Sequence, residues 1–347
     1  MKTAAFLTVA LIALCSTPAA ADRNKKPTQW SVACQILLLV VASQFLCCSR
    51  GEASRLQSAK EAANDKKALG ASSKAEQVMK CSPLSGADQI WSRPALQWVL
   101  IGEQHGNNET PAAFFNLVCD ALVKRKQVTV AVEHPVDEQA ALDGIVMSPD
   151  FESAQRVLLN QPSWENGMDG RASSAMLLLL VSLRELHPKF PALTVAAYDV
   201  SLSANIDFPA RERAIGRKLL SLAKPDHLVL ALTGSLHAVE EPRFGHSMAA
   251  MYLPAKKRLS LEVTDRGGES WERSPEGCGP IKDSVQAKGG PTASGVLLNP
   301  TLAPDGKYDG VLSLGAPLTP SPPAAGIPVP IPTCRTQFLA NHPNLPH

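Results

Sequence analysis

Residues 97–106 read QWVLIGEQHG, an apolar run that passes directly into a glutamate and a histidine between two glycines. The apolar part, 97–101, has the length and composition of a buried β-strand. The next five residues, NNETP at 107–111, combine polar capping residues, an early acid and a proline, as the first turn of a helix does. The stretch therefore predicts a strand that ends in ionisable residues and is followed by a helix over 112–126.

The same alternation of strand and helix signals continues along the chain. Further strands are predicted over 128–132, 193–198, 227–232 and 258–263, and helices over 173–186 and 209–223. Strands that alternate with helices form a mostly parallel sheet with helices on both faces. The sequence therefore predicts an α/β fold with a single core domain over 81–275, and ligands of such folds bind beyond the carboxyl ends of the strands.

Ionisable residues stand at the ends of four of these strands. They are Glu103 and His105, Glu133 and His134, Asp199, and His237. Side chains alternate along an extended chain, so Glu103 and His105 are expected on one side. Because the carboxyl ends of parallel strands lie along one edge of a sheet, these imidazoles and carboxylates are expected to meet there.

Two hydrolytic chemistries suit such a cluster. Glu103, His105, Glu133 and His237 could hold a divalent metal that activates water. Alternatively, a neutral imidazole oriented by a carboxylate acts as a general base towards water without a metal. Arg171 would stabilise an oxyanion or hold an acidic substrate group. The predicted catalytic set is Glu103, His105, Glu133, Arg171 and His237.

A haem- or iron-binding protein is a second hypothesis, because imidazole and tyrosine side chains ligate haem iron. The candidate ligands are His105, Tyr198 and His237. The side chains that would form the apolar slot for haem are Phe114, Phe115 and Met176, which are equally typical of a plain core. A third hypothesis is an anchored scaffold with a degenerate site.

Several of these residues also have structural interpretations. Glu133 and Arg171 could form a buried salt bridge. Asp199 could cap the segment that follows it. Arg211 lies on a predicted helix and is expected on its solvated face. His134 is expected to be a hydrogen-bonded structural residue.

Composition and missing motifs exclude other functional classes. The net charge is +2 with mixed signs, and aromatic residues make up only 5%, which argues against a nucleic-acid partner. The sequence has no GxGxxG after its first strand and no Walker loop, HExxH or GxSxG pattern. Dinucleotide dehydrogenases, nucleotide hydrolases, zincins and the usual serine esterases therefore lose support.

The blocks at the strand ends resemble a known superfamily. LIGEQHG at 100–106, followed by Glu109, is similar to the opening motif of the erythromycin esterase-like and ChaN-like haem-uptake proteins, with the Tiki metalloproteases as distant relatives. Blocks similar to later ones of the superfamily are AVEH at 131–134, DGR at 169–171, SAM at 174–176, AYD at 197–199 and LTGSLHA at 232–238. The resemblance covers roughly residues 96–263.

The resemblance implies an α/β fold with a site centred on Glu103, His105, Glu133 and His237. It implies three candidate activities, namely histidine-dependent lactone hydrolysis, metal-dependent peptidase chemistry and haem binding. The chain departs from the pattern because it lacks a second histidine close behind His237, which weakens the transfer of a specific esterase mechanism.

Both ends of the chain differ in composition from a globular domain. Residues 1–21 have the form of a signal peptide. Residues 22–49 hold a second apolar run, predicted as a membrane anchor, a second signal or a lipoprotein signal. Residues 50–80 are predicted as a charged linker and residues 276–347 as a Pro/Gly-rich tail, with an ordered wrap as the alternative for the tail. All three interpretations of the N-terminus predict an exported protein, periplasmic or membrane-anchored. The partner expected from the residues at the strand ends is a small-molecule substrate or haem.

The cysteines outside the two apolar segments suit an exported protein with disulfides. They are Cys81, Cys119, Cys278 and Cys334. Cys119 lies in a helical apolar pattern and is expected to be a buried free thiol. Cys81 and Cys278 flank the core and are candidates to pair, although the sequence leaves the connectivity open.

Overall fold

The computed structural model describes residues 78–125, 127–165, 167, 169–274, 277–282, 291–303 and 307–326. The predicted signal peptide (1–21), the second apolar segment (22–49) and most of the 50–80 linker lie outside the described residues. Within the part of the chain that the structure describes, no helix has the length and apolar character needed to cross a membrane.

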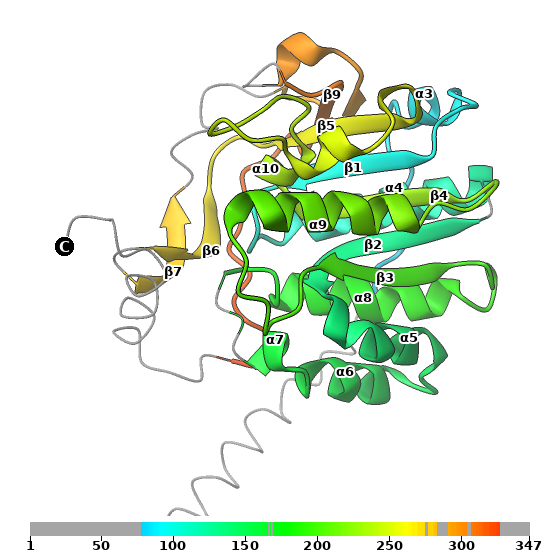
Figure 1. Cartoon of the computed structure of the whole chain (residues 1–347). Helices are drawn as coiled ribbons and strands as arrows, with labels where there is room; N and C mark the ends of the chain where they lie inside the picture. Colours follow the sequence, from blue (N-terminus) through cyan, green and yellow to red (C-terminus); the bar gives the residue numbers. More distant parts are fainter. Residues whose placement is uncertain are drawn as a thin grey trace, which may run out of the picture. The chain divides into compact units, whose positions relative to one another are not determined.

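A seven-stranded sheet forms the centre of the fold, in the order β3-β2-β4-β1-β5-β9-β8 (Figure 1). Its strands are β1 (Trp98–Glu103), β2 (Val128–Pro135), β3 (Thr194–Asp199), β4 (Leu228–Gly234), β5 (Arg258–Thr264), β8 (Gly295–Leu297) and β9 (Gly310–Ser313). Neighbouring strands run parallel except β8, which pairs antiparallel with β9. The mostly parallel α/β sheet and its five predicted strands are confirmed.

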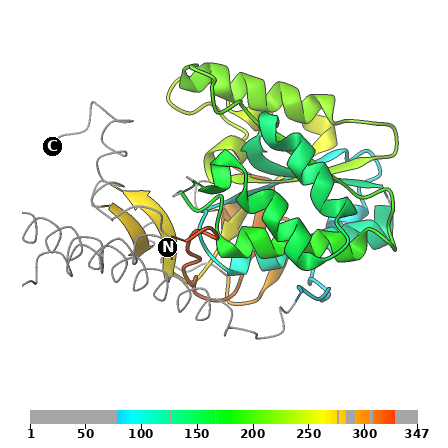
Figure 2. The same cartoon turned by 90° about the horizontal axis from the view of Figure 1, so that it is seen from below.

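The helices lie on both faces of the sheet, because the strands carry apolar side chains on both sides. One face packs against α4 (Glu109–Arg125), α5 (Gln139–Met147), α6 (Phe151–Leu159) and α8 (Ser174–Leu186). The other face packs against α9 (Phe208–Ser221) and α10 (Ser235–Ala238). Figure 2 shows α9 on one side of the sheet and the α5, α6 and α8 layer on the other. The remaining short helices are α3 (Asp88–Trp91), α7 (Pro162–Glu165), η1 (Val136–Glu138), η2 (Ala249–Tyr252), η3 (Ala255–Lys257) and η4 (Pro300–Leu302).

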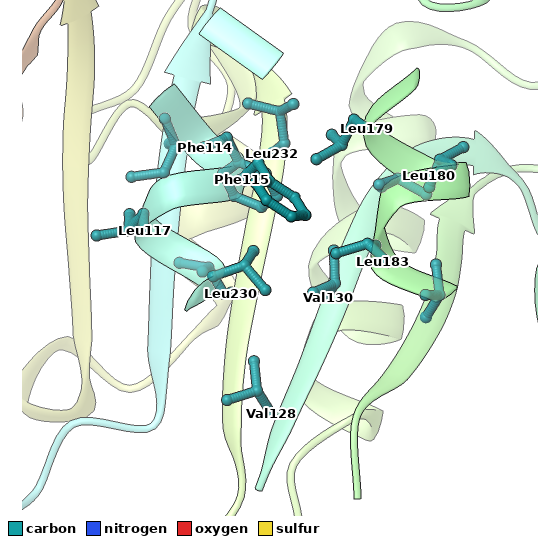
Figure 3. Close-up of a cluster of buried hydrophobic side chains, with 14 of the residues drawn as sticks. Phe114, Phe115, Leu117, Val128, Val130, Leu179, Leu180, Leu183, Leu230 and Leu232 are labelled. Atoms are coloured by element: carbon teal, nitrogen blue, oxygen red, sulfur yellow. The ribbon is translucent and has the colours of Figure 1, made fainter. Parts of the chain in front are cut away.

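The larger core cluster lies between the sheet and the layer of α4 and α8. Figure 3 shows Phe114 and Phe115 of α4 and Leu179 of α8 facing Val130 and Leu232 of the sheet. Alternate strand residues point to the opposite face and pack against α9. Because both faces of the sheet bury apolar side chains, the charged residues of β1 and β2 lie at the strand ends.

The predicted start of α4 is confirmed in its capping contact. The Asn107 Oδ1 atom accepts a hydrogen bond from the Thr110 backbone N–H at 2.8 Å, which satisfies a free donor of the first turn. The helix therefore begins immediately after the 104–108 loop. That loop, with His105 in it, lies at the carboxyl edge of the sheet.

The segment predicted as a C-terminal tail is partly an integral element of the fold. β9 pairs with β5, and β8 pairs with β9, so the sheet continues beyond the predicted domain boundary at residue 275. An antiparallel hairpin of β6 (Glu269–Ser274) and β7 (Gly277–Lys282) precedes them. Residues 319–321 then run along the 104–108 loop, where the Ser321 N–H donates to the Gly106 carbonyl oxygen at 2.8 Å. Residues 291–303 and 307–326 therefore form an ordered wrap, the alternative prediction, and not an extended tail.

Cys119 is disulfide-bonded to Cys81, and the expectation of a free thiol at Cys119 is wrong. The pairing of Cys81 with Cys278 is wrong for the same reason, and Cys278 is itself disulfide-bonded. Cys119 is buried in α4, and the Cys81–Cys119 bond fixes the segment before α3 to that helix. An apolar helical pattern predicts that a thiol is buried, but it does not indicate whether a second cysteine lies next to that thiol.

Replacement of Cys81 should lower stability by removing this crosslink. Cys81 is exposed, so Cys81→Ala leaves the core intact and frees the unfolded chain from a loop of 38 residues. We expect the free energy of unfolding to fall by about 2–4 kcal/mol, measured by urea denaturation. The neighbouring exposed variant Ser82→Ala should be neutral, and equal stability of Cys81→Ala and the unmodified protein would contradict the bond.

Candidate functional site

A pocket of about 600 Å³ opens at the carboxyl ends of the parallel strands. His105 follows β1, Glu133 lies in β2, Asp199 ends β3 and His237 lies in α10 directly after β4. The residues of the predicted catalytic set that line the pocket are His105, Glu133, Arg171 and His237, with Glu103 directly behind His105. The structure thus brings together all five residues that the sequence singled out for hydrolysis.

His105 presents one ring nitrogen to a buried carboxylate and the other to the centre of the site. Its Nδ1 lies 3.1 Å from the Glu103 Oε1, and its Nε2 lies 3.6 Å from the Glu133 Oε2. The His105 side chain is 20% exposed, whereas the Glu103 side chain is 3% exposed. Burial lowers the pKa of His105, but the hydrogen bond with Glu103 and the charge of Glu133 outweigh it, so the pKa is raised. For Glu103, by contrast, burial disfavours the charged carboxylate and raises the pKa.

Two glycines allow this close approach. Gly106 has a φ of +78°, and a side chain there would meet the Trp271 carbonyl oxygen of β6 at 2.0 Å. A Cβ at Gly234 would lie 3.2 Å from the His105 Nε2 and 3.4 Å from the Glu133 Oε2. The parallel register pairs Gly234 with Glu103, which places this open position beside His105.

Glu133 is the most highly connected carboxylate of the site. Its Oε2 accepts from the Gly234 N–H at 2.7 Å, and its Oε1 accepts from the Arg211 Nη2 at 2.9 Å and the Arg171 Nη1 at 3.4 Å. Burial would raise the pKa of Glu133, but the charges of His237, His105 and Arg171 hold it well below its usual range. The salt bridge between Glu133 and Arg171 that the sequence suggested is present.

Asp199 joins the two arginines of the site. Arg211 contacts both of its carboxylate oxygens, at 2.9 and 2.8 Å, in a bidentate pair, and the Arg171 Nη1 donates to its Oδ2 at 2.8 Å. Arg171 also contacts Asp169 at 2.6 Å, and this guanidinium holds the pKa of Asp169 below its usual range against the effect of burial. The result is a network in which each guanidinium is neutralised by carboxylates.

His237 lies between two buried carboxylates. Its Nδ1 is 2.6 Å from the Glu212 Oε1, and its Nε2 is 3.4 Å from the Glu133 Oε1 and 3.1 Å from the Arg211 Nη1. Burial disfavours the charged imidazolium, but Glu133 and Glu212 outweigh it and raise the pKa of His237 to about 9. The raised pKa favours the protonated form of His237 at neutral pH.

Arg211 and Glu212 are site residues that the sequence reading missed, and the solvated-face interpretation of Arg211 is wrong. Arg211 lines the pocket, and Glu212 is fully buried. A signal for them exists, because a helix that follows a parallel strand begins near the carboxyl edge of the sheet. Both residues lie in the first turns of α9, which Asp207 caps through the Ala210 N–H.

Tyr198 does not join the site, although its neighbour Asp199 does. Its side chain is 1% exposed and packs on the α9 face of the sheet, and its hydroxyl donates to the Leu232 carbonyl oxygen at 2.8 Å. Side chains alternate along β3, so the tyrosine is held within the core. His134 lines the pocket, stacks on Trp164 and lies near Ser163 and Glu138, in agreement with a structural role.

The residues present do not fit a metal ion. Within the described part of the chain, no group of three or more histidine, cysteine and carboxylate side chains is arranged to hold one. The physical reason is that Arg171 and Arg211 already place positive charge against Glu133 and Asp199, where a cation would bind. The predicted metal set of Glu103, His105, Glu133 and His237 is therefore not supported.

The residues present do not fit haem either. The pocket is lined largely by charged and polar groups around His105, whereas a haem slot needs apolar walls. The side chains predicted for that slot, Phe114, Phe115 and Met176, belong to the larger core cluster. Figure 3 shows the two phenylalanines there. With Tyr198 in the core as well, the predicted haem-binding set does not converge on one space.

No family model matches the chain, and a comparison with curated proteins found no match. Among solved structures, a mutant of the erythromycin esterase EreC in its open conformation is 9% identical, with a TM-score of 0.44 over 56% of this chain and 78% of that one. A succinoglycan biosynthesis protein is 9% identical, with a TM-score of 0.49 over 72% of this chain and 94% of that one. A bacterial protein toxin is 18% identical, with a TM-score of 0.38 over 52% of this chain, which spans 37% of the toxin. Similarity at this level assigns neither a family nor an activity.

Glu103→Gln should lower the pKa of His105. The hydrogen bond with Glu103 is the largest contribution that raises this pKa, and the amide retains the shape of the carboxylate without its charge. NMR titration of the histidine ring protons in the full chain measures the shift. The control Glu109→Gln alters a nearby carboxylate that binds Thr319 instead, and it should leave His105 unchanged. An unchanged His105 pKa in Glu103→Gln would refute the pairing.

Glu133 should make the protein sensitive to acid. Its folded-state pKa is depressed, so its stabilising contribution is fully present above the unfolded value near 4.5 and is lost as pH falls through the folded value. We expect Glu133→Gln to be less stable at neutral pH and to lose less stability on acidification from about pH 6 to about pH 3. Urea unfolding followed by circular dichroism measures this difference. The exposed variant Glu152→Gln in α6 should keep the acid dependence of the unmodified protein, and a parallel loss in Glu133→Gln would contradict the assignment.

Proposed function

We propose that the protein is an exported hydrolase that uses His105 as a general base, without a metal, to direct water onto an ester, lactone or amide of a small molecule. The observation that carries the proposal is the pairing of the His105 Nδ1 with the buried Glu103, which leaves Nε2 facing a pocket. In the neutral imidazole, this arrangement favours the tautomer that carries its proton on Nδ1 and has a free electron pair on Nε2.

The proposed reaction begins with water between His105 and the carbonyl carbon of the substrate. The His105 Nε2 takes a proton as the water oxygen bonds to that carbon, and the developing oxyanion is stabilised by Arg171, whose side chain is 31% exposed. The bond to the leaving oxygen or nitrogen then breaks, and the leaving group takes up a proton. His237, with its raised pKa, is the proton donor for this second step, and it recovers the proton through His105 and solvent.

The network of Glu133, Asp199, Arg171 and Arg211 would serve to position these groups. Because every carboxylate in it is compensated, the site can stay ordered around His105 before the substrate binds. The proposal needs neither a metal nor haem, in keeping with the donor set of the pocket.

Export is part of the proposal and rests on two observations. The Cys81–Cys119 disulfide suits an oxidising compartment. The sequence of residues 1–21 has the form of a signal peptide, and residues 22–49 would attach the protein to a membrane if they are retained.

His105→Ala should reduce hydrolysis by at least about 10²-fold, because general-base catalysis contributes at least that much. Hydrolysis is measured across a panel of aryl esters, lactones and peptides, each with and without a chelator. The matched control is His246→Ala, which removes an exposed histidine and should retain full turnover. Both variants should melt near the unmodified protein, and undiminished turnover by His105→Ala would remove the proposed role.

A further inference from the structure

Three guanidinium groups line the pocket, and two of them are neutralised within the protein. Arg171 contacts Asp169 and Asp199, and Arg211 contacts Asp199 and Glu133. These contacts use all the carboxylates of the pocket lining, because Glu133, Asp169 and Asp199 are the acidic residues in that lining. The third guanidinium therefore has no counter-charge among the lining residues.

That third group belongs to Arg273 in β6. The side chain is half-buried, and its Nε is shielded from water without a hydrogen-bond partner. No carboxylate of the described residues forms an ion pair with it. A partly desolvated cation without a partner costs free energy, so an anion that pairs with it gains that free energy on binding.

The position of Arg273 relative to His105 is fixed by hydrogen bonds between β6 and the loop after β1. The Trp271 N–H donates to the Gly106 carbonyl oxygen at 2.7 Å, and the Gln104 Nε2 donates to the Ser270 Oγ at 3.0 Å. β6 therefore lies directly along the loop that carries His105. Arg273, two residues beyond Trp271, faces the same pocket as the imidazole.

We propose that Arg273 binds an oxyanion of the substrate, so that the site takes esters, lactones or amides that carry a carboxylate or phosphate group. The guanidinium offers parallel N–H donors that match both kinds of oxyanion. The charges of Arg171 and Arg211 are already compensated by carboxylates of the protein, whereas among the described residues the charge of Arg273 is not. The hydrolysis of such a substrate rests on the proposed function, whereas the binding of an anion by Arg273 does not. It assigns recognition to β6 and the reaction to the loop after β1.

The test measures anion binding separately from hydrolysis. The full chain is titrated with succinate, inorganic phosphate and the neutral isostere succinamide by calorimetry. We expect saturable binding of one or both anions and none of succinamide, with affinity about tenfold or more weaker in Arg273→Gln. Whichever anion binds more tightly distinguishes a carboxylate-bearing from a phosphate-bearing substrate. Arg273→Lys, which keeps the charge but loses the planar fork, should retain part of the affinity.

The matched control is Arg217→Gln, which removes an exposed arginine of α9 and the same unit of net charge. Equal anion binding in Arg273→Gln and the unmodified protein, or an equal loss in Arg217→Gln, would overturn the inference. His105→Ala should still bind the anion. If His105→Ala keeps full turnover while Arg273→Gln loses anion binding, the proposed function fails and the anion site stands. If His105→Ala loses turnover while Arg273→Gln binds the anion as the unmodified protein does, only the anion site fails.

Discussion

The buried carboxylate of Glu133 faces His105 and His237 and contacts both paired arginines of the pocket. It accepts the Gly234 N–H, which ties the end of β4 to the adjacent β2. A carboxylate taken out of water needs compensating charge and hydrogen bonds, and here Arg171, Arg211 and His237 provide them. The elements that follow β2, β3 and β4 are therefore held in fixed positions around one oxygen pair, and the geometry of the pocket depends on it.

The sheet makes this arrangement possible by separating apolar from polar surroundings. Residues of β1, β2 and β4 are buried on both faces, so their charged residues occur only where the strands end. The loop with His105 is then closed from outside by later parts of the chain. The Gly106 carbonyl oxygen accepts from both the Trp271 and the Ser321 N–H, which joins β6 and the C-terminal wrap to the site.

How far the site could be foreseen differs from residue to residue. Glu103, His105, Glu133 and His237 follow apolar runs, and parallel strands must bring such positions to one edge. Arg211 was misplaced because a charged residue near the start of a helix has the same local pattern whether it faces solvent or a neighbouring strand end. Tyr198 was misplaced because the direction of a side chain depends on strand register, which puts Asp199 in the pocket and its neighbour in the core.

The sequence by itself determined the alternation of strands and helices, the parallel sheet and the edge at which the ionisable residues gather, because these follow from local periodicity and capping. Only the tertiary structure decided the pairing of Cys81 with Cys119, the strands β8 and β9 in the Pro/Gly-rich segment, and the contacts of Arg171 and Arg211 with Glu133 and Asp199. Those features depend on contacts between residues far apart along the chain. Local sequence patterns carry no information about such contacts, since many partners would satisfy the same charge, thiol or strand edge.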